Sequence, residues 1–127
     1  MAFDWNNYLT LAEQLATRPD EASKRTAISR AYYCVFNLAF ERAESTAGRH
    51  PEGESYHRWC WSKYERTPDG SCKQLGIDGS RMAQRRVRAD YNASDIRRLE
   101  DQVRRMLGEA RQFRIDIAAL NPRYPLS

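Results

Sequence analysis

The chain has 127 residues, a formal net charge of +4 and 41% hydrophobic residues. This length suits one domain with its own core and is too short for two. No apolar run approaches the roughly 20 residues that cross a bilayer, the N-terminus has no signal-peptide pattern, and the three cysteines are not closely spaced. We therefore expect neither a membrane-spanning protein nor a disulfide framework, and we expect a cytoplasmic location.

The positive charge is concentrated in the C-terminal part of the chain. Residues 1–80 carry ten Lys or Arg and eleven Asp or Glu, whereas residues 81–127 carry eleven Arg and six Asp or Glu. Arginine outnumbers lysine eighteen to three. Arginine favours forked contacts to phosphate or carboxylate, but a GC-rich genome produces the same bias, and composition does not separate the two explanations.

Helical spacing of apolar residues predicts a first helix over 4–16. The proline and acidic residues at 19–21 suit the first turn of a second helix, which has no breaker before residue 47. This second helix is apolar on most sides over 31–40, so it should pack against several neighbours. A polar loop over 46–55 follows it.

The middle of the chain predicts two shorter helices. An aromatic-rich helix is expected over 55–66, and the Pro-Asp-Gly sequence at 68–70 predicts a turn. Gly76 and Gly79 indicate a second weak point, so we expect the next helix, which is very basic, to cover 80–91.

The last helix has the clearest apolar periodicity and is expected over 94–120, with Ser94 as N-cap and Asp95 in the first turn. No segment alternates as a strand does, and there is no internal repeat. We therefore predict an all-α fold, a single antiparallel bundle of four to five helices over 1–120 with a C-terminal tail over 121–127.

Two strong polar side chains interrupt the apolar second helix. Arg30 and Asn37 are seven residues apart, so they lie on one helical face with Tyr33 between them. Since burying an unpaired guanidinium costs several kcal/mol, such groups must find partners or take part in chemistry.

The segment 27–37 resembles the signature helix of HEPN domains. The segment 86–91, Arg86-Val87-Arg88-Ala89-Asp90-Tyr91, resembles the Arg-x-x-Ala-Asp-Tyr segment found in many of them. The order, spacing and lengths of the expected helices also fit, so the resemblance covers about 5–120.

The resemblance implies a bundle that is usually dimeric, common in prokaryotic toxin–antitoxin and antiviral systems, and often a metal-independent endoribonuclease without a cofactor. In active members an Arg, followed after four to six residues by a His, forms a composite site across the dimer. Arg30 matches the Arg, but Asn37 stands where many relatives have His. Asparagine does not titrate, and losing a general acid or base costs about a hundredfold to ten-thousandfold. We therefore expect a weakened or inactive nuclease site.

Other residues complete the expected site. His57 is the candidate substitute for the missing histidine, the alternative being a surface or satisfied core histidine. Arg30 is either a phosphate contact or a structural cation paired with Asp90 of a neighbouring helix, and Tyr33 supports the site. His57 and Cys60 share a helical face, but their spacing matches no familiar zinc module, so no metal is expected.

The last helix has a basic stripe of arginines at seven-residue intervals, Arg97, Arg104 and Arg111. The first two of these are each followed by a second arginine, Arg98 and Arg105. This stripe is either an electrostatic footprint for RNA or a solvated face offset by nearby acids. The residues predicted to bind RNA are Arg86, Arg88, Arg97, Arg104 and Arg111.

Two functions are consistent with these features. The first is an RNA-associated component of a prokaryotic defence or toxin–antitoxin system, with Arg30 contacting phosphate and Asn37 positioning it. The second is a non-catalytic module of the same fold that binds a partner protein, such as a cognate antitoxin, a nucleotidyltransferase or an ATPase. In both cases we expect a homodimer.

Overall fold

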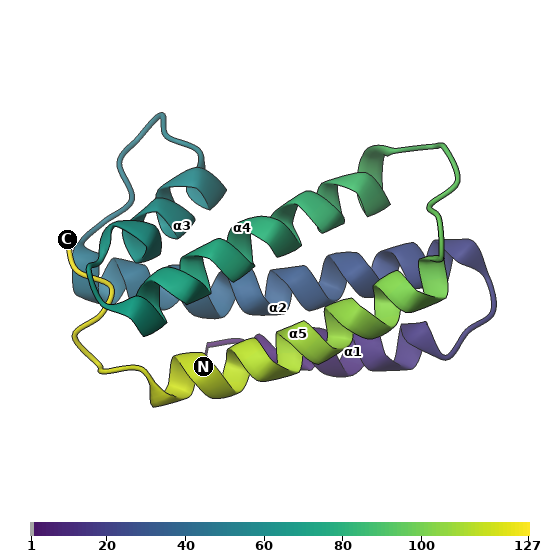
Figure 1. Ribbon diagram of the computed structural model, residues 1–127, viewed down its shortest axis with the longest axis horizontal. Helices are drawn as coiled ribbons and strands as arrows, with labels where there is room; N and C mark the ends of the chain where they lie inside the picture. The colour runs from purple at the N-terminus through teal and green to yellow at the C-terminus, as the bar shows by residue number, and fades with distance from the viewer. Residues whose placement is uncertain (1) are drawn as a thin grey trace.

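The structure is a computed structural model that describes residues 2–127, and this part of the chain forms five helices and no strand (Figure 1). The predicted all-α bundle is therefore confirmed. In Figure 1, α1 and α4 run in one direction and α2 and α5 in the opposite one. The helices are α1 (Asn6–Ala16), α2 (Glu21–Ala47), α3 (Tyr56–Arg66), α4 (Gly70–Tyr91) and α5 (Leu99–Ala119).

Helix α2 is the centre of the bundle. It packs against all four other helices, with α1 and α5 on one side and α3 and α4 on the other (Figure 1). Ala31, Val35 and Ala39 of α2 are fully buried, which explains why its sequence is apolar on most sides. None of the helices formed by residues 2–127 combines the length and apolarity that a membrane span requires.

Three of the helices begin with a side-chain cap. The side chains of Asp20, Ser55 and Asp69 each accept a hydrogen bond from the backbone N–H three residues later, at the starts of α2, α3 and α4. The predicted bounds of the first three helices are correct to within two residues. Pro19 precedes the Asp20 cap, so it lies outside α2 and not in its first turn as predicted.

Helix α4 is continuous from Gly70 to Tyr91, so the predicted break at Gly76 and Gly79 is wrong. Both glycines are buried where α4 lies against α3. A Cβ atom on Gly76 would be 2.7 Å from Cγ of Glu65, and one on Gly79 would overlap the ring of Trp61. The two glycines therefore allow close packing of α3 and α4 and do not end the helix.

The predicted start of the last helix at 94–95 is also wrong, because α5 begins at Leu99. The preceding loop is held by Arg25 of α2. The guanidinium of Arg25 donates a hydrogen bond of 2.9 Å to the carbonyl oxygen of Ser94. It donates further hydrogen bonds to the carbonyl oxygens of Ala89 and Asn92. This long-range contact, which local capping rules do not include, keeps residue 94 out of the helix.

The non-helical segment 121–127 lies against the bundle. Pro125 is fully buried, and the N–H of Leu126 donates a 3.0 Å hydrogen bond to Oγ1 of Thr67. Arg42 of α2 holds the segment at the end of α5. Its guanidinium donates hydrogen bonds of 2.7 to 2.9 Å to the carbonyl oxygens of Ile117, Leu120, Asn121 and Tyr124.

Candidate functional site

Tyr33 lies at the centre of the predicted site. Its ring centre is 5.0 Å from Cζ of Arg30 and 5.3 Å from Cζ of Arg86, and 5.9 Å from the ring centre of His57. Its carbonyl oxygen accepts a hydrogen bond from Asn37. The structure thus gathers residues of α2, α3 and α4 around one tyrosine, and we call Arg30, Tyr33, Asn37, His57 and Arg86 the Tyr33 cluster.

The guanidinium of Arg30 is held by aromatic rings. Its Cζ atom lies 4.8 Å from the ring centre of Tyr8 and 5.0 Å from that of Tyr33. Among residues 2–127 it makes no ion pair, and its one hydrogen bond is a long one of 3.4 Å to Oγ of Ser29. Contacts with the ring faces stabilise the cation and leave most of its N–H donors free. Arg30 is therefore a partly buried cation that can bind an anion.

The direct ion pair between Arg30 and Asp90, which was one of two alternatives for Arg30, does not form. Oδ2 of Asp90 lies 3.4 Å from Nη1 of Arg86, one turn earlier on α4, and accepts a 3.1 Å hydrogen bond from Oγ of Ser29. Residues four apart on a helix are neighbours, so Arg86 satisfies Asp90 more easily than a residue of another helix does. Ser29 links Arg30 to Asp90 indirectly.

Arg86 is enclosed, although it was expected to bind RNA. Only 9% of the residue is exposed, and its Nε atom is buried with no hydrogen-bond partner. Its Cζ atom lies 5.3 to 5.8 Å from the ring centres of Tyr33, Tyr32 and Tyr91. In this arrangement Arg86 fixes the aromatic rings around Tyr33, and its role in RNA binding stays a prediction.

The hydroxyl of Tyr32 determines which ring nitrogen of neutral His57 carries the proton. The indole N–H of Trp61 donates to the Tyr32 hydroxyl at 3.1 Å, and this hydroxyl lies 2.6 Å from Nδ1 of His57. Since the hydroxyl has one proton and no other acceptor for it among the described residues, it donates that proton to Nδ1, and neutral His57 carries its own proton on Nε2. Burial, and then the charge of Arg86, lower the pKa of His57.

This tautomer limits how His57 can contact a ligand. With its proton on Nε2 and its Nδ1 bonded to the Tyr32 hydroxyl, the neutral ring presents no unbonded lone pair to a ligand. Its ring also stacks on Phe36 with centres 4.1 Å apart, which fixes the orientation of the imidazole. Burial raises the pKa of Tyr32, so the hydroxyl stays protonated near neutral pH. The geometry thus supports His57 as a hydrogen-bond donor through Nε2.

Asn37 uses one of its amide hydrogens within its own helix. Its Nδ2 atom donates a 2.7 Å hydrogen bond to the carbonyl oxygen of Tyr33, four residues earlier. Oδ1 and the second hydrogen remain free among the described residues. Because Arg30 and Asn37 are seven residues apart, they lie roughly 10 Å apart along the helix axis, a separation that allows contacts with different groups of one nucleotide.

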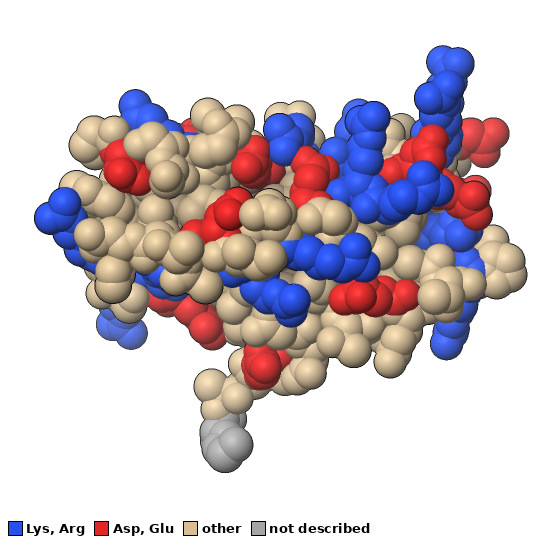
Figure 2. All heavy atoms as spheres, turned by 60° about the horizontal axis from the view of Figure 1, so that its bottom comes forward, with Lys and Arg blue, Asp and Glu red and all other residues tan. Residues whose placement is uncertain are grey.

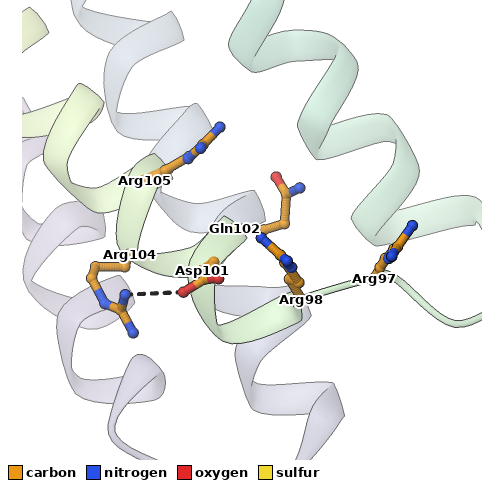
Figure 3. A pocket seen from close by; sticks show the side chains of 6 residues that line it. All are labelled: Arg97, Arg98, Asp101, Gln102, Arg104 and Arg105. Carbon is orange, nitrogen blue, oxygen red and sulfur yellow. Dashed lines mark hydrogen bonds and ion pairs between the residues drawn. The ribbon is translucent and has the colours of Figure 1, made fainter.

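A second concentration of charge lies at the start of α5 (Figure 2). Figure 3 shows the depression there, where four arginines surround Asp101 and Gln102. Nη1 of Arg104 pairs with Oδ1 of Asp101 at 3.0 Å. We call the four arginines, which are Arg97, Arg98, Arg104 and Arg105, the basic cluster.

The predicted basic stripe therefore divides into separate parts. Arg97 and Arg104 belong to the basic cluster, whereas Arg111 pairs with Glu13 of α1 at 3.3 Å. Arg88 is exposed and makes no ion pair among residues 2–127. Arg98 and Arg105, which the predicted set left out, repeat at the same seven-residue interval as Arg97 and Arg104, and that repeat was the signal for them.

The cysteines and histidines do not assemble into a metal site. Within residues 2–127, no three His, Cys, Asp or Glu side chains lie close enough together to hold a metal ion. Cys60, which was expected to share a helical face with His57, is fully buried, and burial raises the pKa of its thiol.

Comparisons of the chain with protein-family models, curated proteins and solved structures found no match. The predicted resemblance to HEPN domains therefore rests on the sequence of two segments alone, 27–37 and 86–91, which include Arg30, Asn37, Arg86 and Asp90.

Proposed function

We propose that this protein is a HEPN-like, RNA-associated component of a prokaryotic defence or toxin–antitoxin system, in which Arg30 contacts a phosphate group of RNA. The observation that supports this proposal is the state of the Arg30 guanidinium. It is partly buried between the rings of Tyr8 and Tyr33 and has no ion-pair partner among the described residues. An anion at this position would satisfy the free N–H donors at a site that is already ordered.

The proposed reaction is slow, metal-independent cleavage of RNA. Attack by the ribose 2′-hydroxyl on the adjacent phosphate requires a base, an acid for the leaving oxygen, and positive charge for the developing phosphorane. Arg30 supplies the charge, and the free Oδ1 of Asn37 can accept a hydrogen bond from a ribose hydroxyl. Nδ1 of His57 is bonded to the Tyr32 hydroxyl, so in this proposal water takes the 2′-hydroxyl proton and water protonates the 5′ leaving oxygen. The lack of a protein base and acid makes the activity weak.

The same observation favours a second candidate function. A site with one ready cation and no free base suits binding without turnover, so the chain also fits a non-catalytic interaction module. Its partner would be a protein such as a cognate antitoxin, a nucleotidyltransferase or an ATPase.

We infer that the protein acts as a homodimer, because in the resembling domains two copies form one composite site. Two exposed tyrosines next to members of the Tyr33 cluster support this inference. Tyr91, whose ring centre lies 5.8 Å from Cζ of Arg86, is 77% exposed, and Tyr56, which precedes His57, is 57% exposed. A dimer is expected by light scattering after size-exclusion chromatography, and a monomer at every concentration would contradict it.

The test of the catalytic proposal is an RNA cleavage assay with EDTA present, on tRNA and on single-stranded RNA. It compares the wild type with Arg30→Gln, Asn37→His and the control Arg66→Gln, which removes an exposed arginine that makes no ion pair with any residue of 2–127. Circular dichroism checks that each variant is folded. We expect slow cleavage by the wild type and by Arg66→Gln, and none by Arg30→Gln.

The Asn37→His variant separates the two candidate functions. Cleavage that appears only in this variant would identify a degenerate nuclease site, since it restores a titratable group. Absence of cleavage in every folded protein contradicts the catalytic proposal and leaves the interaction module.

A further inference from the structure

Arginines with and without partners are distributed unevenly over α4 and α5. Arg81 and Arg85 both pair with Glu109, each at 2.6 Å. Arg86 and Arg111 pair with carboxylates as well. In contrast, Arg97, Arg98 and Arg105 make no ion pair or side-chain hydrogen bond among residues 2–127. The unpaired guanidinium groups thus collect around the depression at the start of α5 (Figure 3).

We propose that the basic cluster binds the phosphate backbone of an RNA strand, as a site separate from the Arg30 contact. This inference rests on the proposed RNA association and adds a second point of attachment to it. Only one carboxylate, that of Asp101, lines the depression, and it is already paired with Arg104. The nearby Glu100 lies 3.4 Å from Nζ of Lys24, so its charge is offset too. A net positive surface remains for an anion.

Guanidinium chemistry fits phosphate at this site. Each exposed arginine presents a planar set of N–H donors that matches two phosphate oxygens. Arg88 lies beside the cluster, since it lines an adjoining depression to which Arg97, Gln102 and the carboxylate-bearing Asp95 also contribute. Several cations in a row along a surface suit a polymer with regularly spaced charges and release its counterions on binding.

An acidic protein also carries a series of negative charges and is the other class of partner for the basic cluster. The lining of the depression favours RNA over such a protein. All six side chains that line it are charged or polar: Arg97, Arg98, Asp101, Gln102, Arg104 and Arg105. Protein interfaces draw most of their affinity from apolar and aromatic anchors in buried pockets, and this depression offers none. Backbone binding of nucleic acid needs no apolar anchor.

The test is fluorescence anisotropy with a short labelled single-stranded RNA over about 50 to 200 mM salt. The triple variant Arg97→Gln/Arg98→Gly/Arg105→Gln removes the unpaired guanidinium groups. Glycine is used at position 98 because Arg98 has φ 55°, a conformation that glycine adopts without strain. The matched control is Arg49→Gln/Lys73→Gln/Arg66→Gln, which removes the same charge from exposed residues outside the depression.

We expect the cluster variant to bind RNA at least about tenfold more weakly at the lowest salt. Its slope of log K against log salt should be smaller by about 2, because three contacts to a single strand contribute roughly 0.7 each. The control should keep the wild-type slope. Equal losses in the two triple variants would show a general charge effect and overturn the assignment. Competition by polyglutamate as strong as by RNA would also overturn it, in favour of an acidic protein.

Arg30→Gln, measured in the same assay, separates this inference from the proposed function. Weaker binding by Arg30→Gln with unchanged binding by the cluster variant overturns the second site alone. The reverse result supports the basic cluster and contradicts the Arg30 contact. A wild type that binds no RNA at any salt concentration overturns both.

Discussion

The Tyr33 cluster and the basic cluster both present guanidinium groups, but they hold them by different means. In the Tyr33 cluster, Arg30 and Arg86 lie against tyrosine rings, and Arg86 is also paired with Asp90. In the basic cluster, the arginines are exposed and three of them are unpaired within the described chain. Packing therefore fixes the geometry of the Tyr33 cluster, whereas the basic cluster is an exposed concentration of largely unpaired charge.

This difference predicts two kinds of contact with one ligand. Exposed charges are screened by salt over a Debye length of about 8 Å at physiological ionic strength, while partly buried charges are screened less. Contacts at the basic cluster should therefore weaken steeply with salt, and the contact at Arg30 should depend more on the exact placement of its neighbours. The following substitutions test the surroundings of the Tyr33 cluster and the basic cluster separately.

Gly79→Ala should have the largest effect, because its new Cβ atom would overlap the ring of Trp61. Overpacking of this kind destabilises a protein by up to about 3 kcal/mol. The displaced indole would also withdraw its hydrogen bond from Tyr32 and so disturb His57. Urea unfolding measures the loss. The salt slope of RNA binding, which we propose to depend on the basic cluster, should persist.

Gly108→Ala is the control for this substitution, since Gly108 lies in α5 with open space around its Cα atom. Alanine is favoured over glycine in a helix by about 1 kcal/mol, so this variant should be more stable than the wild type. Equal effects of the two substitutions would contradict the packing role of Gly79.

Tyr32→Phe should destabilise the protein by about 2 kcal/mol, because it leaves buried donor and acceptor groups without partners. These groups are the indole N–H of Trp61 and Nδ1 of His57. Chemical denaturation measures the free energy of unfolding. Tyr91→Phe is the control, since Tyr91 is 77% exposed and makes no hydrogen bond through its hydroxyl among the described residues. A wild-type stability for Tyr32→Phe would contradict the network.

The free energy of unfolding should depend on pH through His57, with a smaller amplitude. The folded pKa of His57 is lowered by burial and by Arg86, so the unfolded chain binds more protons between this value and the ordinary pKa of about 6.5. The contribution of His57 to the free energy of unfolding should thus be constant above pH about 6.5, and the free energy should fall as the pH is lowered below this value. Thermal unfolding at a series of pH values measures the effect, and His57→Gln should reduce it.

Arg98→Gly should have the smallest effect on stability, and in the opposite direction. Arg98 adopts a left-handed conformation at the start of α5, with φ 55° and ψ 50°, which costs a side-chain-bearing residue roughly 1 to 2 kcal/mol. Glycine relieves this strain but loses more entropy on folding, so the net gain should be at most about 1 kcal/mol. Calorimetry measures the stability, while RNA affinity should fall.

Arg105→Gly is the matched control, because it removes the same charge from the same cluster. Arg105 lies within α5, where glycine is less favourable than arginine by under about 1 kcal/mol. It should therefore lower both stability and RNA affinity. A loss of stability in Arg98→Gly equal to that in Arg105→Gly would contradict the strain at Arg98.

The fold could be predicted from the sequence wherever local signals decide the structure. Apolar periodicity and capping residues predicted α1, α2 and α3 closely. The errors came from residues whose local preference is overridden by distant contacts. Gly76 and Gly79 are residues that often end a helix, but here they allow α4 to pack against α3. Ser94 is a residue type that often caps a helix, but here Arg25 holds it in a loop.

The candidate site could be predicted in part. The seven-residue interval correctly placed Arg30 and Asn37 on one face with Tyr33 between them, as their shared contacts with Tyr33 show. The partner of Asp90 was predicted wrongly, although the four-residue spacing from Arg86 was visible in the sequence. The contacts of Tyr8 with Arg30 and of Tyr32 with His57 join different helices, and no sequence spacing reveals such pairs.

Arg25 connects the helix that carries Arg30 to the loop that carries Arg97 and Arg98. This one side chain fastens the end of α4 and the loop that follows to α2, five residues before Arg30 on the same helix. The loop leads directly into Arg97 and Arg98, so the Arg25 contacts restrain the segment that carries these two arginines relative to α2. If both proposed contacts form, a ligand that spans them would lose less conformational entropy on binding than it would with a free loop. Arg25 would then fix the separation of the two proposed contacts without touching the ligand.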